Sequence, residues 1–191
     1  MIDPIVKETK VIIGPVRLSY THVFEPYAPK DGKSEPKYMT NLLIPKTEKK
    51  TIEAINKAIE TAKQQAIVSK FGGKEPKKLE LPMHDGDEKD NDDDGIYEDH
   101  FYINAKAKTR PGICDKKRVP IMDEEEEVYS GCWAIMSVTF YGYEVNGKKG
   151  IACGLNNIMK FKDDEHLGGR ASAETDFADI PQFDDEDDDD L

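Results

Sequence analysis

Two neighbouring stretches of the sequence, residues 131–145 and 149–162, alternate apolar and polar residues and are joined by the dipeptide Asn146-Gly147. Alternation with a period of two is typical of half-buried strands. Asn-Gly between two such runs is the strongest short sequence signal for a two-residue hairpin turn. The pair therefore predicts a β-hairpin and restricts the chain to folds built around antiparallel strands.

Three further segments have the pattern of strands. They are residues 11–20, 37–44 and 100–110, the last of which is followed by a turn at Pro111-Gly112. The first is interrupted at Gly14-Pro15, a pair that suits a bulge, a bend or an edge better than the middle of a central strand. Pro45 ends the second. The sequence thus predicts about five strands.

One segment has a helical period instead. Between Thr47, a candidate N-cap, and about Lys70, apolar residues recur at spacings of three and four, and Gly72-Gly73 follows. The apolar positions are Ile52, Ile55, Ile59, Ala62 and Ala66. One helix among about five strands predicts a mainly β fold, an OB-fold-like five-stranded β-barrel on which one long inserted amphipathic helix packs.

The net charge of −12 looks wrong for a nucleic-acid-binding protein until its distribution is considered. Residues 163–191 contain 13 acidic residues and one arginine, so residues 1–162 are neutral overall. Within that neutral part, residues 83–99 and 122–127 together have a net charge of −13, and the remaining residues have a net charge of +13. This segregation is expected of a basic binding surface beside acidic segments that mask it. The alternative is a set of acidic loops that only keep the protein in solution.

These observations define the expected organisation of the chain. Residues 1–162 form the barrel domain, with a long acidic loop at about residues 74–99, and residues 163–191 form a disordered acidic tail. No apolar run is long enough to cross a membrane and the N-terminus lacks a secretory signal, so we expect a cytoplasmic protein with no membrane partner. The cysteines Cys114, Cys132 and Cys153 are interpreted as small buried apolar residues.

Side chains of the strand at residues 100–110 separate into two faces, because successive side chains alternate across a strand. The face expected in the core carries Phe101, Ile103, Ala105, Ala107 and Thr109. The opposite face carries His100, Tyr102, Asn104, Lys106, Lys108 and Arg110. Its cations recur about 6.6 Å apart, twice the strand rise, and so suit the phosphates of a single strand, while Tyr102 offers a ring for base stacking. The alternative is an ordinary solvated face.

The segment 131–145 divides in the same way. The face expected in the core carries Ala134, Met136, Val138 and Phe140, and the other face carries the aromatic residues Trp133, Tyr141 and Tyr143. These three rings either form a base-stacking surface or fill a second small core beneath the helix. Tyr141 and Tyr143 are the better candidates for DNA contact, because Ile135 beside Trp133 suggests burial.

Four stretches taken together resemble the bacteriophage and prophage single-stranded-DNA-binding proteins, which have an OB fold and an acidic tail. The stretches are GPVRLSYTHVFEP, KYMTNLLIPK, HFYINAKAKTRPGICD and GCWAIMSVTFYGYEVNGKKGIACGLNNIMKF, and the resemblance covers roughly residues 5–170. It implies sequence-independent binding of single-stranded DNA in phage replication, recombination and repair, in the cytoplasm of a bacterial host. Carried over, it implies a role for Tyr102, Lys106, Lys108, Arg110 and Tyr141.

The tail contains Ile180, Pro181 and Phe183, similar to the Ile-Pro-Phe tip of bacterial single-stranded-DNA-binding proteins. Here the element is internal, because seven consecutive acidic residues and Leu191 follow it. We expect it to meet replication or recombination proteins, together with Asp187, Asp188, Asp189, Asp190 and Leu191. The acidic run approximates the charge density of a nucleic-acid strand, so we also expect it to compete with DNA for the basic groove.

A metal or catalytic site is not expected. Asp90, Asp92, Asp94 and Gly95 match the first half of an EF-hand loop, but Phe101 stands where the closing acidic ligand is required. The four histidines lie too far apart in sequence to suggest a metal triad. Since no cofactor fingerprint and no catalytic motif is recognised, we expect a protein that is not an enzyme and binds no cofactor.

Two other functions fit parts of the sequence. An acidic DNA mimic, or an interaction protein that occupies the nucleic-acid site of another protein, uses the tail but leaves the basic strand face unexplained. A metal-dependent nuclease is disfavoured, because clustered aspartates on a flexible loop do not hold the geometry of a two-metal site. A homo-oligomer is compatible with the sequence.

Overall fold

The Asn146-Gly147 turn joins strand β7 (Trp133–Val145) to strand β8 (Lys148–Lys162). Asn146 and Gly147 have φ values of 50° and 78°, both left-handed, as a two-residue hairpin turn with the strand twist requires. The antiparallel register runs from Val145 opposite Lys148 to Trp133 opposite Lys162. The predicted hairpin is confirmed.

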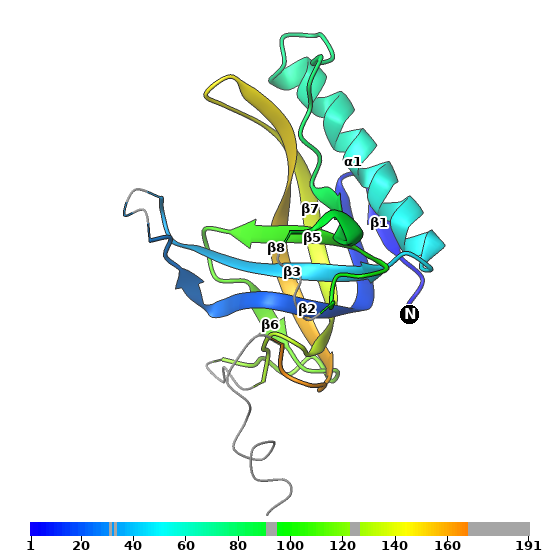
Figure 1. Cartoon of the computed structure of the whole chain (residues 1–191), viewed down its shortest axis with the longest axis vertical. Helices are drawn as coiled ribbons and strands as arrows, with labels where there is room; N and C mark the ends of the chain where they lie inside the picture. The colour runs from blue at the N-terminus through cyan, green and yellow to red at the C-terminus, as the bar shows by residue number, and fades with distance from the viewer. Residues whose placement is uncertain (31, 33, 91–94, 123–126, 168–191) are drawn as a thin grey trace, which may run out of the picture.

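The structure is a computed structural model and describes residues 1–30, 32, 34–90, 95–122 and 127–167. The other barrel strands are β2 (Lys10–Tyr27), β3 (Lys37–Pro45) and β5 (His100–Ala107). They pair in the order β5-β3-β2-β7-β8, and a parallel pairing of β5 with β8 closes the barrel (Figure 1). The predicted mainly β, OB-fold-like five-stranded barrel with one helix is confirmed.

Four short elements decorate the barrel. Strand β1 (Ile5–Lys7) pairs with β2, β4 (Met83–Asp85) pairs with β5, and β6 (Gly112–Cys114) pairs in parallel with β8, while η1 (Gly86–Glu88) is a single 3-10 turn. Such three-residue strands are too short for a period-two pattern to be recognised. The strand β6 therefore occupies what the sequence presented only as a turn at Pro111-Gly112.

The barrel core is built from the faces that alternation assigned to it. Ala134, Met136 and Val138 of β7 are fully buried, as are Ile103 and Ala105 of β5. Phe101 and Ala107, at the ends of β5, are half-buried, and Thr109 lies beyond the strand and is exposed. Of the three cysteines, Cys132 and Cys153 are buried and Cys114 is half-buried, and all are free thiols.

Helix α1 (Lys49–Ser69) packs its apolar stripe mainly on β7 and β2. Close contact depends on Gly142 of β7, because a Cβ there would collide with the Cβ of Ala66. Gly72 and Gly73, both with positive φ, follow the helix as expected. The N-cap prediction was wrong: Glu48 precedes the first helical residue, and the N–H groups of Glu48 and Lys49 donate to the carbonyls of Pro45 and Thr47.

Strand β2 runs through the predicted interruption. The register of β2 against β7 shifts between Ile13 and Val16, so Gly14-Pro15 forms an irregularity inside a long strand rather than a strand end. Gly14 has a φ of 136°, and a Cβ there would lie 2.8 Å from the carbonyl oxygen of Ala134. Glycine is therefore required at this position for both conformation and space.

Candidate nucleic-acid interface

A groove of about 800 Å³ lies where β5, β8 and the β7–β8 hairpin meet. Its floor and walls are formed by residues of β5, β7 and β8 together with residues 79–84. A second hollow of about 410 Å³ continues it toward the connection between β2 and β3 and shares Lys37, Lys106 and Lys108. In OB folds the second and third barrel strands and the two flanking loops bind oligonucleotides, and here β3 and β5 hold those positions. Figure 1 shows the two flanking segments projecting beyond the barrel.

The outward face of β5 supplies the cations of this groove. Lys106 is exposed and Asn104 is half-buried, and both line it. Lys108, just beyond β5, pairs with Glu35 at 2.7 Å, and the hydrogen bond from Lys108 holds the pKa of the Glu35 carboxyl below its usual value. Because both side chains of this pair are more than two-thirds exposed, solvent screens it and Lys108 can exchange partners.

Lys37 is the cation that the sequence interpretation missed. It lies at the start of β3 and lines both hollows beside Lys106 and Lys108. The alternation in β3, with Leu42 and Ile44 fully buried, already placed Lys37 on the outward face with Met39 and Asn41. The cations of residues 100–110 were recognised from the alternation of one strand, and such a pattern does not include a residue of the neighbouring strand.

Two tyrosines of β7, Tyr141 and Tyr143, lie close to glycines of β8 at one end of the groove. The ring of Tyr141 lies near Gly154, where a Cβ would lie 3.4 Å from its Cε1. The ring of Tyr143 covers Gly150, where a Cβ would lie 2.6 Å from the hydroxyl oxygen. Glycines in β8 thus leave the space that the two rings occupy against the strand. Tyr141 is 47% exposed, so its outer face is open to a base.

Glu80 fixes the second of these rings. The hydroxyl of Tyr143 donates a 2.7 Å hydrogen bond to Glu80 Oε2, and this bond, with burial, raises the pKa of Tyr143. Backbone bonds hold Glu80 in turn, since its N–H donates to the carbonyl of Lys149 and its carbonyl accepts from Ile151. The segment around Glu80 is therefore a fixed wall of the groove.

Tyr102 does not line the groove and is covered by aromatic neighbours, one of them from the acidic loop. Tyr97 is buried, and its hydroxyl lies 3.0 Å from Ser19 Oγ and accepts a hydrogen bond from Asn41 Nδ2. The Tyr97 ring meets that of Tyr102 edge-on at 5.1 Å, and His84 lies against Tyr102 at 5.2 Å. Tyr102 is therefore enclosed by aromatic neighbours and is less open than Tyr141. The long acidic loop predicted at about residues 74–99 is therefore anchored to the barrel through the buried Tyr97.

Arg110 and Trp133 lie outside this groove. The guanidinium of Arg110 lies 5.3 Å from the ring of Phe24. The indole of Trp133 lies at the far end of β7, where its Nε1 donates a 2.6 Å hydrogen bond to Asp164 Oδ2. Tyr141 lies eight positions after Trp133, so the two residues are about 26 Å apart along β7. The aromatic residues predicted on one strand face thus divide between two places.

The remaining candidate residues fall beyond what the structure describes or form no site. The tail residues Ile180, Pro181, Phe183, Asp187, Asp188, Asp189, Asp190 and Leu191, and Asp92 and Asp94 of the EF-hand-like loop, lie outside the described residues. Within the described ranges, no group of three or more histidines, cysteines or acidic residues is arranged to hold a metal ion. No helix in those ranges is long and apolar enough to cross a membrane.

A family model described as the single-stranded-DNA-binding protein of Enterobacter phage Enc34 matches residues 9–191. The chain belongs to this family. The Enc34 family consists of DNA-binding proteins rather than enzymes. A further relative, the putative protein p50 of Acyrthosiphon pisum secondary endosymbiont phage 1, is 32% identical over an aligned length of 187, and the match covers 93% of this chain and 97% of the relative.

Solved structures of the Enc34 family agree with the fold. The Enc34 protein in complex with single-stranded DNA superposes with a TM-score of 0.73 at 31% identity, covering 87% of this chain and 94% of that one. A second structure of the Enc34 single-stranded-DNA-binding protein has a TM-score of 0.72 at 29% identity, covering 93% of this chain and 94% of that one. The single-stranded-DNA-binding protein gp2.5 of bacteriophage T7 has a TM-score of 0.58 at 17% identity over 91% and 94%, and so shares the fold.

Proposed function

We propose that the groove between the β2–β3 connection and the β7–β8 hairpin is the surface on which this Enc34-family protein binds single-stranded DNA without sequence preference. The observation that carries the proposal is the placement of three lysines, Lys37, Lys106 and Lys108, and the exposed ring of Tyr141 along one hollow. Lysines follow a phosphate backbone, and a ring with an open face accepts any base.

The contacts divide into two kinds. The lysines supply sequence-independent attraction that weakens with salt, because each phosphate they neutralise releases counterions. Tyr141, with Tyr143 beside it, supplies stacking of about 1 to 3 kcal/mol per base. Asn104 lines the same hollow. Tyr102 contributes at the edge of the path, and Arg110 lies outside the hollow, near Phe24.

The acidic tail is proposed to compete with DNA for this groove and to bring replication, recombination or repair proteins to it. Residues 168–191 carry ten acidic residues and one arginine. Their attachment point at Leu167 is fixed to the barrel by a backbone hydrogen bond to Ser130. Twenty-four residues span up to about 80 Å when extended, so the acidic run at 184–190 has the length to reach the groove.

Titration of the full chain with labelled oligo(dT), followed by anisotropy at several salt concentrations, tests the groove. Binding that tightens at low salt supports it, and absence of binding at low salt contradicts it. The DNA-mimic alternative would then gain weight, and a pull-down in which the tail captured a protein while the body bound no DNA would favour it.

Neutralising the tail in the full chain tests the competition. Replacing the seven acidic residues 184–190 by asparagine and glutamine keeps the length of the chain and removes seven negative charges. Affinity for oligo(dT) is expected to rise most at low salt, where charge competition is strongest. Equal affinity of both proteins at all salt concentrations would contradict a competing tail.

A further inference from the structure

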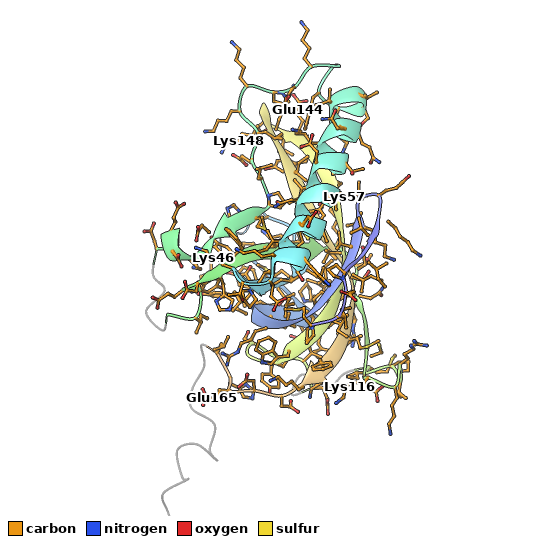
Figure 2. All side chains as sticks on the ribbon, turned by 90° about the vertical axis from the view of Figure 1, so that its right-hand side faces the viewer. Lys46, Lys57, Lys116, Glu144, Lys148 and Glu165 are labelled. Carbon is orange, nitrogen blue, oxygen red and sulfur yellow. The ribbon has the colours of Figure 1, made fainter. Side chains whose placement is uncertain are left out.

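The segment Asp163 to Leu167, which the sequence placed in the tail, lies on the barrel at the opposite end from the β7–β8 hairpin. Figure 2 shows Glu165 and Lys116 at one end of the molecule and Lys148 and Glu144 at the other. We call Asp163 to Leu167 the strap. Its surroundings are basic and aromatic, although the strap itself is acidic.

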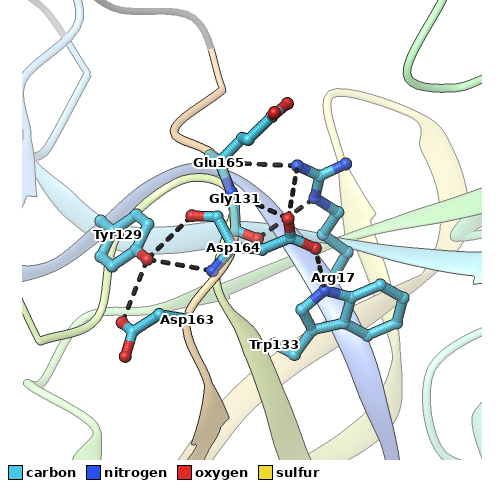
Figure 3. Close-up of polar contacts among 7 residues, drawn as sticks. All are labelled: Arg17, Tyr129, Gly131, Trp133, Asp163, Asp164 and Glu165. Carbon is cyan, nitrogen blue, oxygen red and sulfur yellow. Dashed lines mark hydrogen bonds and ion pairs between the residues drawn. The ribbon is translucent and has the colours of Figure 1, made fainter. Parts of the chain in front are cut away.

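The carboxylate of Asp164 is held in the way a phosphate group would be held. Trp133 Nε1 donates to one oxygen at 2.6 Å, and Arg17 Nη2 lies 3.9 Å from the other (Figure 3). The hydrogen bond from Trp133, reinforced by the charges of Arg17 and Lys162, holds the pKa of Asp164 below its usual value. An indole N–H and a guanidinium are hydrogen-bond donors, and they donate to phosphate oxygens as readily as to carboxylate oxygens.

The imidazole of His166 is held in the way a base would be held. Its ring stacks on that of Tyr129 with 3.9 Å between centroids and 13° between planes. Nearly parallel stacking on a tyrosine is how single-strand-binding proteins accept any base. A pocket of about 250 Å³, lined by residues 21–25 and 128–130, lies on the surface beside Tyr129 and leaves room for a larger ring system.

The strap sits directly on the barrel backbone because Gly131 has no side chain. A Cβ there would collide with the carbonyl oxygen of Glu165. Part of what holds the strap is accessible, since the side chains of Arg17 and Asp164 are 23% and 34% exposed, whereas Lys160, which pairs with Asp163 at 2.8 Å, is only 13% exposed. Salt screens the more exposed Arg17–Asp164 pair, so an anion in excess competes with Asp164 for Arg17.

A further cation lies beside the strap. Lys162 lies 4.9 Å from the centre of the Trp133 ring. Lys116, which lies 5.6 Å from the ring centre of Phe161 on β8, is at the same end of the molecule as Glu165 but on its other side (Figure 2), and Lys117 and Arg118 are exposed beside it in the sequence. An incoming polyanion thus meets Lys162 beside Trp133 and further cations at the same end of the barrel.

We propose that the strap covers a second subsite for single-stranded DNA, in which a phosphate replaces the Asp164 carboxylate at Trp133 and Arg17 and a base replaces His166 on Tyr129. The proposal rests on the groove function, since it extends the same DNA strand to a second place on the barrel. A strand bound in the groove and longer than the roughly 26 Å between Tyr141 and Trp133 has the length to displace the strap.

Tryptophan fluorescence of the full chain reports on this subsite and not on the groove, because Trp133 is the only tryptophan and lies outside the groove. Two full-length variants make a matched pair. Asp164→Ala removes the carboxylate seated at Trp133, whereas Glu165→Ala removes an equal charge from a side chain for which the described contacts are only those of its backbone. Asp164→Asn keeps an acceptor for Trp133 without the charge.

With a 30-nucleotide oligo(dT), Asp164→Ala is expected to bind at least about threefold more tightly than Glu165→Ala and to show a larger fractional quenching of Trp133. Asp164→Asn should fall between them. Adding Lys162→Glu to Asp164→Ala should remove the gain. Equal affinity and equal quenching of Asp164→Ala and Glu165→Ala would overturn the subsite while leaving groove binding, read by anisotropy, intact. Loss of anisotropy binding in every variant would overturn both proposals.

Discussion

Trp133 donates its indole N–H to Asp164 across the boundary at which the sequence predicted the folded domain to end. The contact joins the first residue of β7 to a residue just beyond β8. It satisfies the polar atom of a half-buried tryptophan, as a partly buried indole requires. The consequence is that contacts with the barrel continue beyond the end of β8 at Lys162 as far as Leu167, so the residues that follow are attached at a fixed point.

The pH dependence of the Trp133 emission follows from the lowered pKa of Asp164. A carboxyl group whose pKa is lowered by folding stabilises the fold above its unfolded pKa, and the stabilisation is lost as pH falls through the folded pKa. The ordinary value is 3.8, so the Trp133 emission should stay constant down to about pH 4 and change below it. Fluorescence titration from pH 7 to pH 2 measures this.

The matched control for that titration is Asp164→Asn, which has no carboxyl group to protonate at this position. Its Trp133 emission should show no transition of its own before the whole protein unfolds in acid. A transition in the unmodified chain centred at or above pH 4, or the same transition in the variant, would contradict the assignment to Asp164.

Stacking on Tyr141 is expected to contribute about 1 to 3 kcal/mol to the binding of one base. Tyr141→Ala should therefore weaken oligo(dT) binding by roughly 5- to 150-fold, since each 1.4 kcal/mol is a factor of ten. Tyr141→Phe keeps the ring and should bind within about twofold of the unmodified chain. Anisotropy titrations measure the affinities of both variants. Thermal melting checks that the alanine variant remains folded without the ring beside Gly154. Equal affinities of the alanine and phenylalanine variants would exclude stacking at this ring.

Packing of α1 on the barrel depends on the contact between Gly142 and Ala66. Gly142→Ala should lower the free energy of unfolding by about 1 to 3 kcal/mol, because the added Cβ forces the helix away from β7. Ala66→Gly in the same chain makes room for that Cβ, so the two changes should be less than additive. Urea denaturation of the two single variants and the double variant measures the coupling. Strict additivity would show that the contact does not limit the packing.

The barrel and the outward face of β5 were predictable because their patterns are local. Alternation assigned Ile103 and Ala105 to the core and Lys106 to the surface from the order of the residues alone. The Asn146-Gly147 turn fixed the register of β7 against β8 for the same reason. Features that follow from one local rule, such as the faces of a strand or the register of a tight hairpin, were therefore predictable from the sequence alone.

The rest of the site was not predictable because it depends on contacts between distant residues. Nothing near Tyr97 in the sequence indicates that its hydroxyl meets Ser19 and Asn41, so the anchoring of the acidic loop was not predictable. The space that the Tyr141 ring occupies depends on Gly154 of the next strand. Burial of Trp133 was inferred from its neighbour Ile135, whereas its hydrogen-bond partner is the distant Asp164. Pairings of this kind become visible only when the strands are placed side by side.

The double variant Lys106→Glu, Lys108→Glu tests the central claim, that this groove binds single-stranded DNA. Its control is Lys49→Glu, Lys57→Glu, the same charge change at exposed positions of α1. Anisotropy titration with labelled oligo(dT) across a salt series is the measurement, with circular dichroism to confirm that both variants fold. We predict that the groove variant binds about tenfold or more weakly than the control and that its salt dependence is shallower by about 1.4 in log–log slope. Equal affinity and equal slope in the two folded variants would contradict the groove.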